Sequence, residues 1–82
     1  MTPEQKQKLE EIANYCQKKS NEYRKTNLKL SDRWAGFAGR AGECKFASIG
    51  YERFVEFLND LHDPDNGTEI TKAIGLEIES IM

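Results

Sequence analysis

The side chains that most often carry out chemistry are few in this sequence: one histidine, His62, and two cysteines, Cys16 and Cys44. His62 stands between Asp60 and Asp63, where a general base is conceivable, but an imidazole at the exposed end of a helix is far commoner. Both cysteines fall at apolar positions of a helical pattern, where a small buried residue is expected rather than a nucleophile. We therefore predict no catalytic residue, and an enzyme is the least favoured class of function.

The segment Asp63–Gly67 has the composition of a calcium-binding loop but not its spacing. Counted from Asp63, the glycine stands fifth instead of sixth, and the twelfth residue is Ile74 instead of a bidentate glutamate. The sequence also contains no Cys-x-x-Cys pair, no histidine cluster and no glycine-rich phosphate loop after a strand. We predict a capped turn here, with no metal and no cofactor.

The composition indicates one globular helical domain over residues 1–82, because 38% of the residues are hydrophobic and 32% are charged. A domain this short buries a small core, so self-association would help it. The first eight residues are polar, and no stretch approaches the roughly 18 apolar residues that span a bilayer. We expect a cytoplasmic protein with reduced cysteines and no membrane contact.

Three helices position these residues. Thr2 and Gln5 can form a capping box around Pro3, which predicts a first helix over residues 3–26. Ser31 and Asp32 can cap a second helix over residues 32–61. The proline and Asn-Gly pair in residues 62–67 end that helix, and a short third helix follows over residues 68–81. The predicted fold class is all-α: a long antiparallel helical hairpin plus a short C-terminal helix, assembled as a homo-oligomer.

The first two helices carry apolar seams that step by threes and fours. Folded about a turn near residue 30, the seams place Leu9 level with Tyr51 and Cys16 level with Cys44.

Four glycines in the second helix each cost about 1 kcal/mol relative to alanine, so a compensating contact is expected. On a helical wheel Gly39 and Gly42 lie away from the seam, near Gly50 and two phenylalanines. We interpret this side as a protein-binding face made of Gly39, Gly42, Phe46, Gly50 and Phe57. The alternative is that the glycines break the helix at about residues 36–42.

Charge is divided unevenly along the chain. Residues 1–40 hold nine Lys or Arg against five Asp or Glu, and residues 41–82 hold three against nine, so the halves carry about +4 and −6. The candidate contacts for a nucleic acid or a small phosphorylated ligand lie around the predicted hairpin tip: Lys25, Lys29, Arg33 and Arg40. Against a nucleic acid, the sequence pI is only about 5.4.

These features together favour a small non-enzymatic protein-binding module, an adaptor or an inhibitor of a partner protein. Short, charged helical hairpins of this kind are common among accessory proteins of phages and mobile elements. Binding of nucleic acid or a phosphorylated small molecule by the basic tip is the alternative function.

Overall fold

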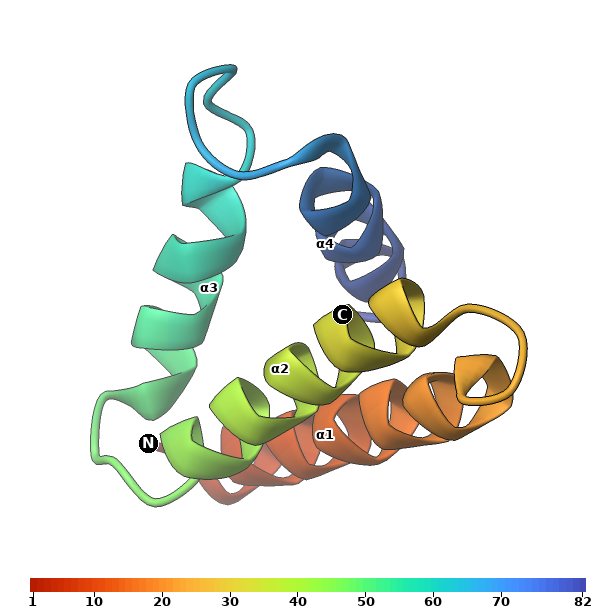
Figure 1. Cartoon of the computed structure of the whole chain (residues 1–82). Helices are drawn as coiled ribbons and strands as arrows, with labels where there is room; N and C mark the ends of the chain where they lie inside the picture. Colours follow the sequence, from red (N-terminus) through yellow and green to blue (C-terminus); the bar gives the residue numbers. More distant parts are fainter.

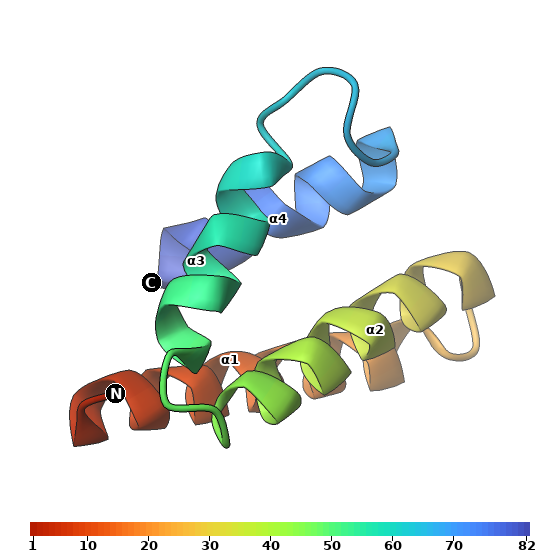
Figure 2. The same cartoon turned by 90° about the vertical axis from the view of Figure 1, so that its left-hand side faces the viewer.

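The structure, a computed structural model, describes residues 1–82, which form four helices and no strand. The helices are α1 (Pro3–Tyr23), α2 (Leu28–Cys44), α3 (Gly50–Asp60) and α4 (Glu69–Ile81) (Figure 1). Figure 2 shows α1 and α2 side by side in one layer, with α3 and α4 above them. The all-α fold class is confirmed. None of the helices combines the length and apolar character needed to cross a bilayer.

The start of α1 follows the predicted capping box. Thr2 Oγ1 accepts a hydrogen bond from the Gln5 backbone N–H at 3.1 Å, and Gln5 Oε1 accepts one from the Thr2 N–H at 3.0 Å. The start of α2 differs from the prediction. Asn27 caps it, because Asn27 Oδ1 accepts the Leu30 N–H at 3.2 Å, and α2 therefore begins at Leu28 instead of residue 32.

The contact between α1 and α2 is set by a reciprocal pair of buried serines. Ser20 Oγ donates to the Ser31 carbonyl and Ser31 Oγ donates to the Ser20 carbonyl, each at 2.8 Å. A turn near residue 30 would place Ser20 level with residue 40. This predicted register is wrong, because Ser20 lies against Ser31. The connection between α1 and α2 occupies residues 24–27. Every residue of α1 therefore faces a different residue of α2 from the one predicted.

The predicted second helix, residues 32–61, is in fact two helices separated by residues 45–49. The alternative break at residues 36–42 is also wrong, since Gly36, Gly39 and Gly42 all lie inside α2. The reversal depends on Gly50, whose backbone packs against the preceding helix: a Cβ at Gly50 would stand 1.6 Å from the Cys44 carbonyl oxygen. Only a residue without a side chain allows α3 to leave α2 this closely.

The break lets all four helices contribute to one core. Phe54 of α3 is completely buried, and Leu58 follows it one helical turn later. The fully or almost fully buried apolar side chains are Leu9, Ile12 and Cys16 of α1, Trp34, Phe37 and Ala41 of α2, Phe54 and Leu58 of α3, and Ile74 and Ile78 of α4. The wide apolar arc predicted for one long helix is thus divided between two helices that face the same interior.

Polar contacts attach α4 to α1. The Tyr15 hydroxyl donates to Glu77 Oε2 at 2.5 Å, and Lys19 Nζ lies 3.5 Å from the same oxygen. Lys8 Nζ donates to the carbonyl of Ile81 at 2.9 Å. These bonds join residues more than 50 positions apart in sequence, and they close the C-terminal helix over the core.

Gly50→Ala and Gly36→Ala are expected to change stability in opposite directions. At Gly50 the added Cβ meets backbone, so we expect the free energy of unfolding to fall by about 2 kcal/mol or more. At Gly36 the Cβ meets nothing within 4 Å, so the higher helix propensity of alanine should raise the free energy of unfolding by about 0.5 to 1 kcal/mol. Urea denaturation of both variants checks this; equal changes would contradict the role assigned to Gly50.

Candidate docking surface on helix α2

The three chemically reactive side chains of the sequence differ in their surroundings: His62 is exposed and paired with Glu79, Cys16 is buried and Cys44 is half-buried. His62 Nε2 lies 2.8 Å from Glu79 Oε1, at the edge of an open hollow of about 420 Å³ between α3 and α4. Burial, helped by the charge of Glu77, raises the pKa of the Cys16 thiol to about 12. Burial also raises the pKa of the Cys44 thiol. At neutral pH both cysteines are therefore protonated, and neither is the thiolate that nucleophilic attack requires.

The polar groups of the Asp63–Gly67 segment are used to shape its own backbone. Asp63 Oδ1 accepts the Asp65 N–H at 2.9 Å, and the Asn66 side-chain amide donates to the Asp60 carbonyl at 3.0 Å. Gly67 has a positive φ of 74°, which suits glycine. The segment is a capped turn, and no group of three or more His, Cys, Asp or Glu side chains in the structure is arranged to hold a metal ion.

The residues predicted to form one protein-binding face are separated by the break between α2 and α3. Gly39 and Phe46 are exposed and Gly42 is half-buried, all on or just beyond the end of α2. Gly50 is buried at the start of α3. Phe57 is half-buried among Phe37 and Phe54, with ring centroids 5.4 Å and 6.2 Å away. The structure thus leaves Gly39, Gly42 and Phe46 together and places the other two residues in the packing of α3.

The six glycines fall into two groups. Gly50, Gly67 and Gly75 have reasons within the fold: a Cβ at Gly50 or Gly75 would stand 1.6 Å from backbone or 2.8 Å from Leu61, and Gly67 has a positive φ. No contact within the fold requires glycine at the three positions in α2, because a Cβ at Gly36, Gly39 or Gly42 would meet nothing within 4 Å. Together these three cost the helix about 3 kcal/mol relative to alanine, and no contact within the chain offsets that cost.

Large apolar side chains stand at both ends of this glycine-rich side of α2. Leu28 is 67% exposed and Phe46 is 79% exposed. Four residues that step by seven, four and three positions follow one side of α2, Leu28, Ala35, Gly39 and Gly42, and Phe46 stands just beyond the end of the helix. We call this row the open stripe. The sequence analysis did not include Leu28, because it predicted that the second helix begins at residue 32. The Asn27 cap starts α2 at Leu28 instead.

A groove runs beside the open stripe, towards the start of α3. It encloses about 490 Å³ and is lined by small and charged residues: Ala35, Gly36, Gly39, Arg40, Glu43, Cys44, Ala47 and Arg53. The Arg40 guanidinium lies over the Phe57 ring, 4.0 Å from its centroid, so this arginine covers an aromatic side chain of the core rim. The side of α2 that faces away from α1 is therefore hollow, and small residues and charged residues line the hollow together.

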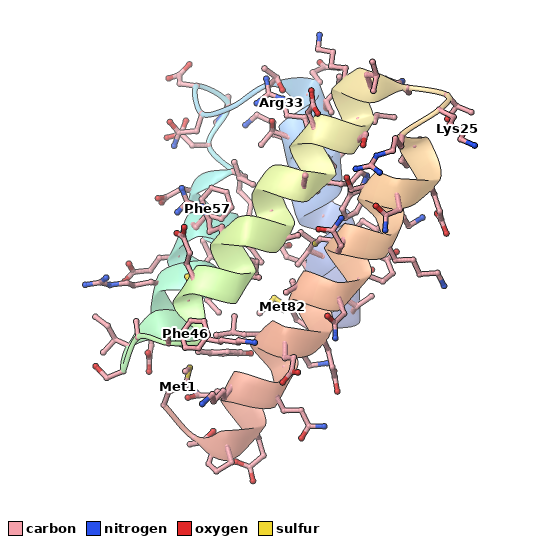
Figure 3. All side chains as sticks on the ribbon, turned by 60° about the horizontal axis from the view of Figure 1, so that its bottom comes forward. Met1, Lys25, Arg33, Phe46, Phe57 and Met82 are labelled. Carbon is pink, nitrogen blue, oxygen red and sulfur yellow. The ribbon has the colours of Figure 1, made fainter.

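The structure separates the four basic residues predicted to bind a nucleic acid or a phosphorylated ligand into three at the tip and one at the core rim. Lys25, Lys29 and Arg33 are exposed around the connection between α1 and α2, and none of them forms an ion pair within the chain. Figure 3 shows Lys25 and Arg33 at this end of the molecule and Phe46 towards the other. Arg40 points to Phe57 instead. Three free cations, rather than four, therefore remain at the tip.

Searches against family models, curated proteins and solved structures find no match to this chain.

The buried Cys16 thiol is expected to make stability depend on alkaline pH. Its pKa rises from the ordinary 9.0 to about 12 in the folded protein. The protonated thiol thus contributes its full stabilisation below pH 9.0 and progressively less as the pH rises towards 12. Denaturant unfolding between pH 7 and pH 11 should show a steeper fall for the natural protein than for Cys16→Ala. Parallel curves would contradict this.

Proposed function

We propose that this chain is a small non-enzymatic protein-binding module, an adaptor or an inhibitor, whose contact surface is the open stripe of α2. The observation that carries the proposal is the group of three helix glycines that no contact within the fold requires. A second helix could pack into the space left by the missing side chains, because small residues allow helix backbones to approach closely.

The exposed ends of the open stripe support the same proposal. Leu28 at the start of α2 and Phe46 just beyond its end are large apolar side chains left in water. Isolated exposed apolar residues are ordinary, but two that flank a row of small residues along one helix support an interface at this position. The settings of His62, Cys16 and Cys44 also favour binding over catalysis, since none is arranged as a nucleophile with its base.

Photocrosslinking from the open stripe tests the proposal. Replacement of Phe46 by p-benzoylphenylalanine keeps an aromatic ring at the most exposed apolar position. In the cells that naturally produce the chain, irradiation should give a protein adduct. The same probe at Asn14, exposed on α1 beside the polar residues Gln7, Glu10 and Glu11, should not. A Cβ at Gly39 would meet no other atom within 4 Å, so Gly39→Leu extends from the helix into the hollow beside it, and it should remove the adduct.

Two results would contradict the proposal. One is the absence of any adduct at position 46, and the other is an adduct that persists unchanged in Gly39→Leu while circular dichroism shows that the variant is folded.

The three free cations at the tip favour a second candidate function, the binding of nucleic acid or a small phosphorylated molecule. Lys25, Lys29 and Arg33 are exposed and have no acidic partner within the chain. Arg40 contributes less, because its guanidinium already lies over Phe57.

If the tip binds nucleic acid, a gel shift with DNA or RNA should weaken steeply as salt rises and be lost in Lys25→Glu/Lys29→Glu. Lys6→Glu/Lys18→Glu, exposed on α1, is the control for a change in net charge alone. No shift at low salt would exclude this version of the function, and an equal loss in the control would show binding without a defined site.

A further inference from the structure

We infer that the chain has a second docking surface, the hollow between α3 and α4, and that its partner is a basic protein segment in which an apolar side chain is flanked by Lys or Arg. The residues that line this hollow come from the end of α3, from the connection that follows it and from α4 (Figure 1). None of them belongs to the open stripe of α2, so this inference and the proposed function can fail independently.

The hollow has an apolar floor and one exposed apolar side chain. Leu58 and Leu61, at the end of α3, are buried and line the floor. Gly75 of α4 lets Leu61 pack closely, since a Cβ at Gly75 would stand 2.8 Å from Leu61 Cδ1. Leu76 lines the same hollow and is 57% exposed. An apolar side chain of a partner that enters the hollow would therefore remove apolar surface from water on both molecules.

Carboxylates follow the connection that borders the hollow. Residues 60–69 contain no Lys or Arg and four acidic residues: Asp60, Asp63, Asp65 and Glu69. All four are exposed, and none forms an ion pair within the chain. Glu69 lines the hollow, and Asp63 and Asp65 stand on either side of Pro64, which also lines it. Negative charge is therefore concentrated at this edge of the hollow.

The positive groups of the hollow are already engaged within the chain. Lys72 is the only Lys or Arg that lines it. Lys72 Nζ donates to the Leu61 carbonyl at 2.9 Å and also to the Asp63 carbonyl, at the end of α3. His62 Nε2 lies 2.8 Å from Glu79 Oε1. The exposed carboxylates at the edge of the hollow therefore outnumber its positive charges.

A basic protein segment with an apolar anchor matches both features. Its apolar side chain covers Leu76 and the floor, and a Lys or Arg beside that side chain meets Asp65 and Glu69 with opposite charge. The same carboxylates repel the phosphates of nucleic acid and of anionic lipid, and they repel an acidic protein segment. The partner of this hollow therefore differs in chemistry from an anion bound at the basic tip.

A short basic peptide tests the inference on the full chain. The probe is acetyl-Lys-Lys-Leu-Lys-Leu-Lys-Lys-amide, titrated into isotope-labelled protein and followed by the NMR chemical shifts of the backbone amides. The largest shifts should fall on Leu61, Gly75 and Leu76, and added salt should weaken the binding because it screens exposed charges. A peptide with Ser in place of Leu should bind about tenfold more weakly, and one with Glu in place of Lys should not bind.

Two variants with matched controls locate the contact. Leu76→Ser should raise the dissociation constant of the probe about tenfold, whereas Leu28→Ser, which removes a similarly exposed leucine of α2, should leave it unchanged. Glu69→Lys should raise the dissociation constant about fivefold, whereas Glu43→Lys, which makes the same charge change at an exposed position of α2, should not. The amide spectrum of each free variant shows whether it is folded.

Three results would overturn the inference. They are the absence of shifts at about millimolar probe, shifts centred on α2 instead of the hollow, and binding that is unchanged in the serine peptide or in a folded Leu76→Ser variant. None of these results bears on the proposed function, because crosslinking from position 46 measures the open stripe alone. An adduct there leaves the proposed function standing whatever the probe does at the hollow.

Discussion

At the junction of α2 and α3 the backbone of Gly50 lies against the carbonyl of Cys44, in space that no other residue could share. The close approach ends α2 and turns the chain so that Phe54 and Leu58 enter the core formed by α1 and α2. Without it, the apolar pattern of residues 34–58 would continue along one helix, and the C-terminal part of that helix would extend beyond α1. The burial of Phe54 depends on this reversal of the chain.

The glycines show how one residue type serves the fold and the surface in different ways. Gly50 is required by neighbouring backbone, and Gly75 lies close to the Leu61 side chain, so both glycines make room for other parts of the chain. Gly36, Gly39 and Gly42 face open space on α2. They lower the stability of the helix, and no contact inside the molecule compensates for this. The contrast directs attention to the outer side of α2, which the rest of the chain leaves uncovered between two exposed apolar residues.

The uneven charge of the chain is partly used to hold the molecule together. Lys8 and Lys19 of the basic half reach the Ile81 carbonyl and the Glu77 carboxylate of the acidic half. Glu77 also accepts the Tyr15 hydroxyl and raises the pKa of that phenol, chiefly through this hydrogen bond. Such partly exposed contacts contribute modestly to stability, but they orient α4 on α1. Lys25, Lys29 and Arg33 have no such internal role, which leaves them available at the surface.

Local chemistry in the sequence was sufficient for the helix ends that depend on a few neighbouring residues. The Thr2–Gln5 capping box and the stop before Thr68 were both predicted, and the apolar spacing identified Leu9, Ile12 and Cys16 as buried. For the candidate site, the same spacing placed Gly39 and Gly42 in one helix, and Phe46 lies just beyond the end of that helix.

Only the tertiary structure decided where the second helix breaks, how α1 and α2 are aligned, and that Gly50 and Phe57 belong to the packing of α3. Residues 44–58 keep a helical period across the break, so periodicity alone could not reveal it. The Asn27 cap likewise competed with an equally acceptable cap at Ser31, and burial of Ser31 against Ser20 decided between them. Both choices depend on contacts between residues distant from the local pattern, since the free energy of packing, not local propensity, determines which of two permitted local structures forms.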